Sequence, residues 1–487
     1  MTEIMECYNE PNQCINPTIP TEMKLLEQLP QPVCRLTAAI IAAGGRPVLV
    51  GGAVRDYLLG ATPKDFDIES YGLEAKALSL AVERVAKVHS VGKCFGVFKA
   101  KVNGMEIDVT LPRREKKVGL GHRGFEVDYD PSMSFAEAAS RRDFTINAIG
   151  IDLATGKLLD PWEGVNDLNA KRIRHVSDAF DEDPLRVLRA CQFSARFGFQ
   201  IAAETVEKCL SLCDELATLS TERIWEEFKK MLLKSPKPSV GLGAMEATGA
   251  LGLFPELVQI RETGHNPASH SDGWEHSCLV LDACVTIKRE ENLDDHDALV
   301  LMLAALCQNL GNPFTASQVN GLKHNQGDKK TENTPLRSLL GRMGCPPSLV
   351  DRVAVLVREH GQSYQLWRQP NDQLVGDGAI RRLALRVPIR TLCRLILAND
   401  RARKSTDGFE PCANVNWLLE RSKALGVLEH PPKPIFQGRH LQGLGVSTGP
   451  LMGALLKESF EAQLDAVFVD LPSAMIWAQT QIQTYPT

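Results

Sequence analysis

The chain has 487 residues, of which 44% are hydrophobic and 24% are charged. These fractions are ordinary for a globular protein and exclude disorder along the whole chain, and the length predicts roughly three domains. No apolar run reaches the ~18 residues that a membrane helix needs, so we expect no membrane partner. The net charge of −5 predicts that any surface for nucleic acid is a local basic patch.

The cysteines and the N-terminus bear on the location of the protein. The 13 cysteines are scattered, and none forms a Cys-x-x-Cys pair. A zinc site of that kind and a dense disulfide framework are therefore poorly supported, and we expect a reducing, cytoplasmic location. The N-terminal residues MTEIMECYNEPNQ are acidic and lack an apolar core, so they predict neither a secretory signal nor a transit peptide.

Strands and helices are mixed in the first third of the chain. Residues 1–30 read as an irregular extension. Between 31 and 175 the apolar pattern predicts several elements, namely strands at 47–52, 64–70, 95–102 and 105–111 and helices at 53–60 and 73–88. Asn103-Gly104 predicts a hairpin turn between the last two strands. Residues 119–131 have turn chemistry, and we expect them to be mobile.

The remaining two thirds of the chain has helical periodicity almost throughout. A polar stretch broken by Gly and Pro at 312–336 predicts a surface insertion, and HPPKPIF at 430–436 predicts a linker to a last helical piece. The architecture is thus α+β: a small mixed head with room for one active site, followed by a long helical body that we expect to hold the substrate.

Gly51 and Gly52 end a predicted strand and open a helix. Such a turn lets backbone N–H groups approach an anion, and the helix N-terminus adds partial positive charge. Arg55, one turn into the helix, is placed to clamp the same anion. Taken alone, the motif fits a tight turn with a solvated arginine better.

Asp65 and Asp67 are spaced i, i+2 on a predicted strand and so point to the same face. Two adjacent carboxylates repel each other unless a cation lies between them. Mg²⁺ accepts one or two carboxylates and completes its shell with phosphate oxygens and water. This is the arrangement that phosphoryl transfer requires, although acidic pairs at this spacing also arise by chance.

A third carboxylate is predicted at Asp108, on the strand at 105–111. A neighbouring strand can place it beside Asp65 and Asp67, as a ligand or an activator of an attacking hydroxyl; an acid on an edge strand is the equal alternative. A rival acidic set lies just before Pro131 in turn chemistry and on no long strand, and we reject it: Glu126, Asp128 and Asp130.

Arginines follow in two groups. Arg141, Arg142 and Asp143 open a predicted helix, RRDFTINAIG, and adjacent arginines point in different directions, so that Arg142 can face a triphosphate. A solvated basic pair is the alternative.

In EDPLRVLR (182–189), Asp183, Arg186 and Arg189 share much of one helix face. Asp183 before Pro184 is also an ordinary helix start. A carboxylate beside a guanidinium matches the Watson–Crick edges of cytosine and adenine but opposes a carbonyl of uracil.

These motifs, in this order, resemble the class II tRNA nucleotidyltransferase and bacterial poly(A) polymerase family. The matching stretches are LVGGAVRDYLLG, KDFDI, RRDFTINAIGID, DPWEGVNDL and EDPLRVLRACQFSARFGF, and the resemblance is strong over about 47–235. It implies a polymerase-β-like nucleotidyltransferase head and helical neck, body and tail. It also implies addition of CMP and AMP from CTP and ATP to the 3′ end of tRNA, with Mg²⁺ and release of pyrophosphate.

The resemblance assigns domains and roles to this chain. It implies an N-terminal extension at 1–30, a head at 31–175, a neck with the base-selecting helix at 176–255, a body at 256–430 and a tail that contacts RNA at 431–487. Asp65 and Asp67 would hold the metals, and the nucleotide would contact Gly52, Arg55, Arg142, Asp183, Arg186 and Arg189. From the strand and glycine-turn arguments above, rather than from the resemblance, we add Asp108 as a catalytic residue and Gly51 as a nucleotide contact.

Further positions follow from the same resemblance. Residues 112–131 would be the flexible loop that helps the change from C to A addition. Asp183 with Arg186 would be the amino-acid template for the incoming base. Gln192 departs from the family, which often has Arg there, and this puts one basic contact in doubt.

The body resembles a degenerate HD phosphohydrolase fold. GWEHSCLVLDA (273–283) resembles the opening of that domain, with His276 as its first ligand, but Gln308-Asn309 stand where His-Asp is expected. Amides do not supply the charge or the imidazole nitrogen of such a metal site, so we expect a metal-free body. His360 and Asp400 are read as leftover positions or, more often, as structural or exposed residues.

Three alternatives stay open beside addition of CCA. The motifs do not separate it from a poly(A) polymerase, nor from a partial enzyme that adds only CC or only A. The body could instead be a working phosphohydrolase, although Gln308-Asn309 speaks against this. A catalytically silent RNA-binding module is the third, although it leaves the carboxylate pair unexplained. The sharp turn at Gly449-Pro450 in the tail can present N–H groups to RNA phosphates or serve as ordinary packing.

Overall fold

The computed structural model describes residues 24–89, 97–117, 125–263, 273–310, 333–367, 376–407 and 413–484. Most of the predicted N-terminal extension and insertion, and the middle of the predicted loop at 112–131, lie outside these residues. The chain divides into two compact units, Met1–Ser220 with Gly243–Ala250 and Thr221–Leu242 with Leu251–Thr487. The finer ranges predicted for head, neck, body and tail stay a prediction.

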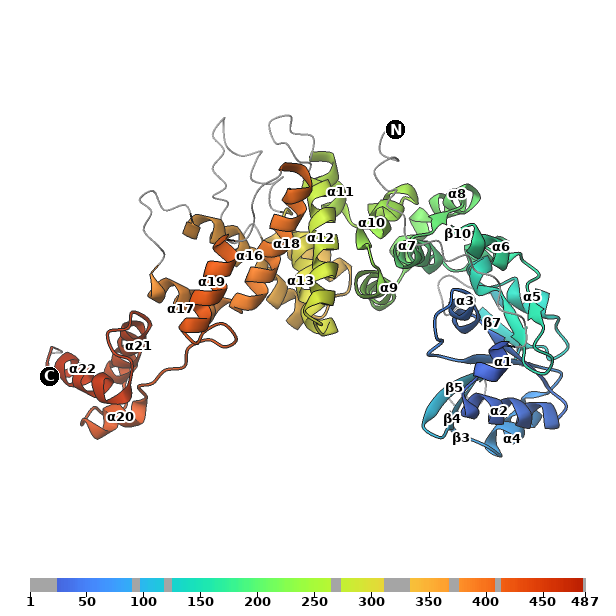
Figure 1. Cartoon of the computed structure of the whole chain (residues 1–487), viewed down its shortest axis with the longest axis horizontal. Helices are drawn as coiled ribbons and strands as arrows, with labels where there is room; N and C mark the ends of the chain where they lie inside the picture. The colour runs from blue at the N-terminus through green and yellow to red at the C-terminus, as the bar shows by residue number, and fades with distance from the viewer. Residues whose placement is uncertain are drawn as a thin grey trace. The chain divides into compact units, whose positions relative to one another are not determined.

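A mixed seven-stranded sheet forms the framework of the first unit (Figure 1). Its order is β3-β4-β5-β2-β1-β8-β9, and only β2 and β5 run parallel. The strands are β1 (Arg46–Val50), β2 (Asp67–Tyr71), β3 (Lys87–His89), β4 (Val97–Val102), β5 (Met105–Thr110), β8 (Gly150–Asp152) and β9 (Leu158–Leu159). The strands predicted from the apolar runs are therefore present, with ends shifted by a few residues.

Local chemistry explains how the sheet is built. Asn103 and Gly104 both have positive φ, 50° and 88°, as the predicted two-residue hairpin between β4 and β5 requires. The predicted helix at 73–88 is too long, because α4 (Ala75–Glu83) ends and the chain continues into β3, which pairs with β4. Helix α2 (Gln31–Ala42) contacts both α4 and the sheet through apolar side chains, Val33, Leu36 and Ile40.

Two predictions about the end of the sheet are wrong. The segment from Arg141 is not a helix: a short 3₁₀ turn, η1 (Thr145–Asn147), is followed directly by β8, which pairs with β1. Tertiary hydrogen bonds override the helical pattern here, since the amide of Thr145 donates to the carbonyl of Arg174 at 2.9 Å. The stretch before Pro131 is not all turn, because β6 (Arg113–Lys117) and β7 (Phe125–Tyr129) form a hairpin that carries Glu126 and Asp128.

Short helices complete the first unit. They are α1 (Lys24–Gln28), α3 (Gly52–Leu58), α5 (Phe135–Ala139), α6 (Gly164–Asn169), α7 (Leu185–Phe197) and α8 (Ala203–Ser211), with 3₁₀ turns η2 (Asp178–Glu182) and η3 (Cys213–Thr218). A small parallel pair, β10 (Arg172–Ile173) and β11 (Gln200–Ile201), joins the chain after α6 to the end of α7. Gly198 ends α7 with a φ of +68°, a left-handed conformation that favours glycine.

The second unit is helical in all of its described parts. Its elements are α9 (Thr221–Lys234), α10 (Pro238–Ala247, shared with the first unit), η4 (Ala250–Leu253), α11 (Pro255–Thr263), α12 (Gly273–Glu290), α13 (Asp295–Cys307), α15 (Asn333–Arg342), α16 (Pro347–Trp367), α17 (Asp377–Arg386), α18 (Ile389–Asp407), α19 (Ala413–Ala424), α20 (Gly438–Gly443), α21 (Pro450–Leu464) and α22 (Leu471–Ile482). Helix α13 is buried from Ala298 to Cys307 and contacts α9, α12, α16 and α18, so it is the core of this unit (Figure 1).

The last three helices pack around an apolar cluster of their own. Its buried members include Phe436, Leu441, Leu455 and Phe468. Among the described residues, no helix combines the length and the apolar character that crossing a membrane requires. Each of the nine cysteines that the structure describes is a free thiol.

Gly164 offers a test of how tightly the first unit is packed. A Cβ at this position would lie 2.2 Å from the carbonyl oxygen of Thr145, a backbone atom that cannot move aside cheaply. We expect Gly164→Ala to lower the free energy of unfolding by about 1–3 kcal/mol. Thermal and denaturant unfolding followed by circular dichroism measure this change.

Gly243→Ala is the matched control. Gly243 is helical and exposed, and no atom lies within 4 Å of the position that its Cβ would take. This variant should be neutral or slightly stabilising, because alanine favours helix. Equal stabilities for Gly164→Ala and the wild type would contradict the packing argument.

Candidate active site

The candidate site begins with two carboxylates on neighbouring strands. Asp67 is the first residue of β2 and is in register with Asp108 on the parallel strand β5. The amide of Asp108 donates to the carbonyl of Phe66 at 3.1 Å. Asp65 lies in the bend before β2 rather than on the strand itself. Asp65 and Asp67 are exposed while Phe66 between them is only 5% exposed, which agrees with two carboxylates on one face.

The charges around Asp67 include more nearby acids than bases. The atoms around the carboxyl of Asp67 raise its pKa by desolvation, although solvent still reaches the residue. The charge of Asp108 raises this pKa further, Arg142 lowers it and Asp65 adds a smaller increase. A group whose pKa is raised in this way favours a neutralising cation nearby.

Gly51 separates Asp67 from Arg142. Its φ of +71° is in the left-handed region that favours glycine. A Cβ here would lie 3.2 Å from Nη1 of Arg142 and 3.7 Å from Oδ2 of Asp67. Glycine is thus required by the backbone, and its missing side chain leaves space between an acid and a base.

Arg142 has unused hydrogen-bonding capacity. Its Nε is buried and has no hydrogen-bond partner among the described residues. Nη1 lies 3.4 Å from the carbonyl oxygen of Asn147, and Nη2 lies 3.7 Å from Oε2 of Glu69, so both contacts are long. A guanidinium with free N–H groups that faces a gap is suited to bind a phosphate.

Arg55 is held firmly instead. It is 4% exposed and donates to Oδ1 of Asn147 at 2.5 Å and to Oδ1 of Asp56 at 2.8 Å. Its guanidinium lies over the rings of Phe193 and Phe197, 5.2 and 4.8 Å from their centroids. Burial lowers the pKa of Arg55, and the charge of Asp56 opposes this change. The predicted solvated arginine is therefore wrong.

Asp143 connects η1 to α7 through Asn147 and Arg189, a role that the sequence did not indicate. It is 8% exposed and accepts hydrogen bonds from the amide of Phe144 at 2.8 Å, Nδ2 of Asn147 at 2.9 Å and Nε of Arg189 at 2.8 Å. Burial would raise the pKa of Asp143, but Arg189 and these hydrogen bonds outweigh it and hold the pKa below its usual range.

Asp183 and Arg186 lie on either side of Leu185, where α7 begins. Oδ1 of Asp183 accepts from the amide of Leu185 at 3.1 Å, as an ordinary helix start would have it. Arg186 donates to the carbonyls of Ala179 at 2.5 Å and of Arg141 at 2.7 Å. These two carbonyls orient the guanidinium.

Sequence reasoning missed Asp143, Asn147 and the ion pair between Arg141 and Glu182 (2.5 Å). Asn147 accepts from Arg55 and Arg142 and donates to Asp143, so it links the arginines of the site. A weak signal was present in the sequence: polar residues recur inside RRDFTINAIG, where an ordinary buried segment would be apolar. Gln192, which departs from the family pattern, is buried at 3% exposure on α7.

The carboxylates suit a metal that takes only part of its ligands from the protein. Within the described parts of the chain, no group of three or more His, Cys, Asp or Glu side chains is close enough to hold one metal ion. Mg²⁺ is commonly bound by one or two carboxylates together with phosphate oxygens and water. The charge imbalance at Asp67 and Asp108 fits a hard divalent cation of this kind.

The helical unit has a separate polar cluster at the position of the predicted HD site. Asn399 on α18 accepts from or donates to three side chains: His276 Nε2 at 3.0 Å, Gln308 Oε1 at 2.9 Å and His360 Nε2 at 3.3 Å. Asn309 donates to Oγ of Ser277 at 2.9 Å. Burial, with Arg403 and His276, lowers the pKa of His360 to about 4. The cluster thus contains Asn399, the chain neighbour of Asp400, for which the sequence predicts a leftover position or, more often, a structural or exposed residue.

Two family models match this chain. The Poly A polymerase head domain matches residues 48–174, and a probable RNA and SrmB-binding site of polymerase A matches residues 198–260. The Multifunctional CCA protein of Pasteurella multocida is 39% identical over 327 residues, which are 65% of this chain and 74% of the relative. That of Xanthomonas campestris is 36% identical over 373 residues, 75% of this chain and 86% of the relative.

The chain belongs to the tRNA nucleotidyltransferase and poly(A) polymerase family. The family predicted from the sequence motifs is thereby confirmed. Solved structures of the family share the fold: the CCA-adding enzyme of Bacillus stearothermophilus in complex with CTP has a TM-score of 0.62 at 21% identity, covering 94% of this chain and 99% of that one. The Thermotoga maritima enzyme complexed with tRNA has a TM-score of 0.56 at 19% identity, covering 94% and 98%. The predicted α+β architecture is confirmed.

The pKa of Asp67 tests the charge balance of the site. In the metal-free protein, Asp108→Asn removes a negative charge that lies in register with Asp67 on the neighbouring strand β5. We expect the pKa of Asp67 to fall towards its ordinary value, so that the carboxyl stays ionised to lower pH. Carboxyl titration by ¹³C NMR measures this directly.

Glu106→Gln is the control, because Glu106 is an exposed acid on the same strand. It should leave the titration of Asp67 nearly unchanged, since exposed charges are screened. If Asp67 titrates identically in Asp108→Asn and in the wild type, the two carboxylates are not coupled.

Proposed function

We propose that this chain adds CMP and AMP from CTP and ATP to the 3′ end of tRNA without a nucleic-acid template and releases pyrophosphate. The proposal rests on one observation: Asp67, in register with Asp108 on the neighbouring strand, lies across Gly51 from the partly unpaired guanidinium of Arg142. The names of the relatives, Multifunctional CCA protein and CCA-adding enzyme, support the choice of reaction.

In this proposal Asp65 and Asp67 hold divalent metal ions, which we take to be Mg²⁺. Two such ions supply neutralisation of phosphate charge and alignment of the attacking and leaving oxygens when they are bound. Asp108 lies beside them and accepts the proton of the RNA 3′-hydroxyl. That hydroxyl attacks the α-phosphorus in line with the leaving pyrophosphate.

Arg142 binds the triphosphate with its free N–H groups, while the amides at Gly51 and Gly52 approach the same phosphates. Arg55 keeps the helix start in place and adds positive charge below it.

Asp183 and Arg186 read the base. The carboxylate accepts from the exocyclic amine of cytosine or adenine, and the guanidinium donates to the adjacent ring nitrogen. Arg189 lies one turn further along α7, where its bond to Asp143 ties the base-reading helix to the triphosphate segment.

The RNA is held chiefly through backbone and shape, since one enzyme serves many tRNAs. We assign this to the predicted neck, body and tail at 176–255, 256–430 and 431–487, and nucleotide transfer to the head at 31–175. We further propose a cytoplasmic location, because the substrates are cytoplasmic and the described thiols are free. Poly(A) synthesis and partial CC or A addition are the alternatives in the same class.

The body does not favour a second activity. A phosphohydrolase of the HD type would need acidic and imidazole ligands where Gln308, Asn309 and Asn399 supply amides. We propose that the body is a scaffold without a metal.

An extension assay tests the reaction and its alternatives. Transcribed tRNA ending in the discriminator base, in C or in CC is incubated with each NTP alone and with CTP and ATP together. We expect addition of two C and then one A, and loss of activity by roughly 10³-fold or more in Asp67→Ala, because the metals lose a ligand. Long A tails on unrelated RNA would point to poly(A) polymerase, and a reaction that stops at CC or needs CC would point to a partial enzyme.

Asp128→Asn is the matched control for loss of an acid. Asp128 lies exposed on β7 and belongs to the acidic set that we rejected. Its neutralisation should leave the first C addition, on tRNA ending in the discriminator base, within about twofold of the wild type, because exposed charges contribute little and the predicted loop at 112–131 acts only in the change from C to A. Equal losses in Asp67→Ala and Asp128→Asn would contradict the assignment of the metal site.

Base selection is tested by Asp183→Asn. The amide oxygen can still accept from the amide of Leu185, so the helix start is preserved. The second carboxylate oxygen becomes an N–H₂ donor, which suits the carbonyl of uracil better than an amine. We expect the preference for CTP over UTP, measured as the ratio of kcat/KM values, to fall about tenfold or more. An unchanged ratio would remove Asp183 from base reading.

A further inference from the structure

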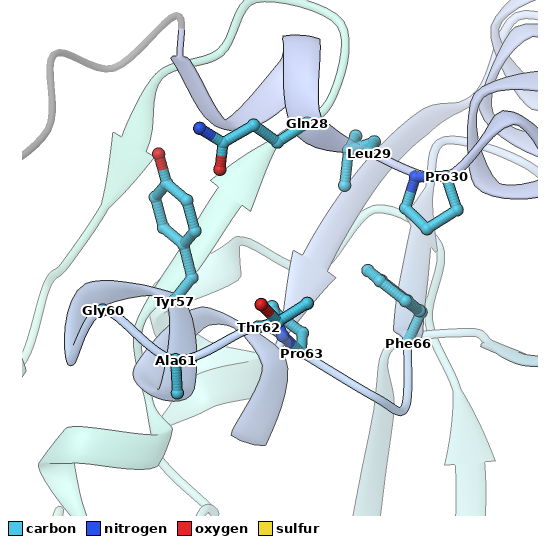
Figure 2. Close-up of a pocket in the computed structure, with 9 residues that line it drawn as sticks. All are labelled: Gln28, Leu29, Pro30, Tyr57, Gly60, Ala61, Thr62, Pro63 and Phe66. Carbon is cyan, nitrogen blue, oxygen red and sulfur yellow. The ribbon is translucent and has the colours of Figure 1, made fainter.

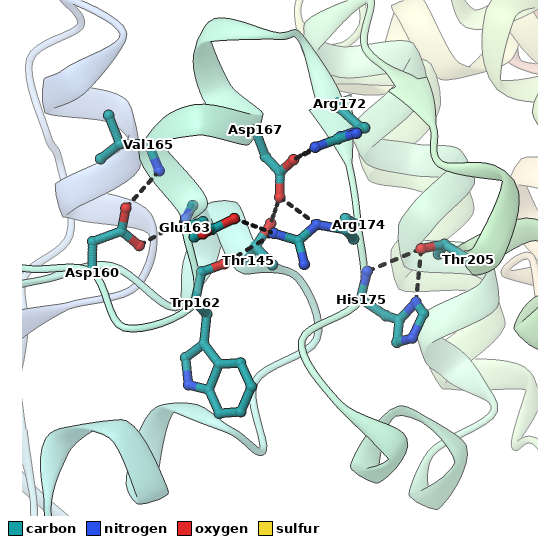
Figure 3. Close-up of polar contacts among 11 residues, drawn as sticks. Thr145, Asp160, Trp162, Glu163, Val165, Asp167, Arg172, Arg174, His175 and Thr205 are labelled. Carbon is teal, nitrogen blue, oxygen red and sulfur yellow. Dashed lines mark hydrogen bonds and ion pairs between the residues drawn. The ribbon is translucent and has the colours of Figure 1, made fainter.

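The motif DPWEGVNDL contains a buried carboxylate that the proposed reaction does not use. Asp167 on α6 is 0% exposed and lies at the centre of the polar contacts in Figure 3. A carboxylate that is removed from water must be fully compensated, or it destabilises the fold. Its partners therefore indicate what it holds in place.

Three side chains donate to Asp167. Arg172 Nε reaches Oδ1 at 2.7 Å, and Arg174 Nε reaches Oδ2 at 2.8 Å. The hydroxyl of Thr145 donates to the same Oδ2 at 2.6 Å (Figure 3). The arginines follow α6 in the chain, whereas Thr145 comes from the segment that carries the active-site residues.

Thr145 is the first residue of η1, and Asn147 is its last. Asn147 accepts from Nη1 of Arg55 at 2.5 Å through its side chain and from Nη1 of Arg142 at 3.4 Å through its carbonyl. Because η1 has only three residues, we expect a shift of Thr145 to shift Asn147, the hydrogen-bond partner of both Arg55 and Arg142.

Helix α6 is itself fixed against this turn. The amides of Gly164 and Val165 donate to Asp160 at 2.7 and 2.9 Å, which anchors the start of the helix (Figure 3). The missing side chain of Gly164 lets α6 approach the carbonyl of Thr145. The hydroxyl of Thr145 is thus the directional contact between a fixed helix and the turn.

We infer that Asp167 is a positioning residue for nucleotide binding, and that it acts through the hydroxyl of Thr145 to set Arg55 and Arg142 at the triphosphate. The inference rests on the proposed function for the identity of the ligand. The two arginine partners of Asp167 serve the fold, whereas the Thr145 contact serves the site. The two roles are separable, because Thr145 can be changed while both ion pairs remain.

Thr145→Val tests this directly. Valine has nearly the shape of threonine, and Asp167 keeps its two guanidinium partners. The buried carboxylate loses one donor, so we expect a folded protein of lower stability. We expect the dissociation constant and KM for CTP to rise about tenfold, with KM for tRNA within twofold of the wild type, since a misplaced Arg142 binds the triphosphate less well. Thr145→Ser keeps the hydroxyl and should show wild-type values. Thr145→Ala also removes the hydroxyl but adds no methyl group near Gly164, so it separates loss of the hydrogen bond from crowding.

Thr205→Val is the matched control (Figure 3). The hydroxyl of Thr205 bonds to the amide of His175 at 3.0 Å and faces its ring at 2.8 Å, in the same part of the fold but with no link to Asn147. It should lower thermal stability without changing CTP affinity. Equal weakening of CTP binding in Thr145→Val and Thr205→Val, or none in Thr145→Val and Thr145→Ala, would overturn the inference.

CTP binding is measured by equilibrium dialysis without RNA. The inference is therefore decided even if the wild type transfers no nucleotide, an outcome that would contradict the proposed function alone.

Discussion

The like charges of Asp67 and Asp108 are the constraint on which the head depends. Parallel pairing of β2 with β5 puts these two residues in register, and desolvation together with the charge of Asp108 raises the pKa of Asp67. Nearby positive charge favours the ionised form. Arg142 supplies part of it from across Gly51, and the remainder is left for a ligand. The sheet thus holds an excess of negative charge, which the metal-bound triphosphate of the proposed reaction would balance.

The arginines of the site divide according to how far the protein has already satisfied their hydrogen-bonding groups. Arg55 and Arg186 are engaged by an amide, a carboxylate and carbonyl oxygens, so their geometry is set before any ligand arrives. Arg142 keeps a buried Nε without a partner among the described residues. In the proposed reaction, the groups that are already hydrogen-bonded would give position, and the less satisfied guanidinium of Arg142 would give affinity.

In the helical body, the positions that correspond to an HD metal site carry amides in place of acidic ligands. His276 and His360 converge on Asn399, and Gln308 completes the cluster with its amide oxygen. The amides of Asn399 and Gln308 pair without net charge, although Nε2 of Gln308 is buried without a hydrogen-bond partner among the described residues. A carboxylate at Asn399 would instead carry a negative charge into this cluster, and burial makes such a charge costly unless it is paired.

The sequence alone determined the family, the strand that ends in Gly51, the hairpin at Asn103-Gly104 and the acids at Asp65 and Asp67, because these depend on local chemistry at short spacing. It failed where distant segments decide the local conformation: the predicted helix from Arg141 gave way to η1, since the amide of Thr145 pairs with a carbonyl far along the chain. The links through Asn147 likewise join residues that only folding brings together. Periodicity reports which face is buried, but the partner of a buried polar group is decided by tertiary structure.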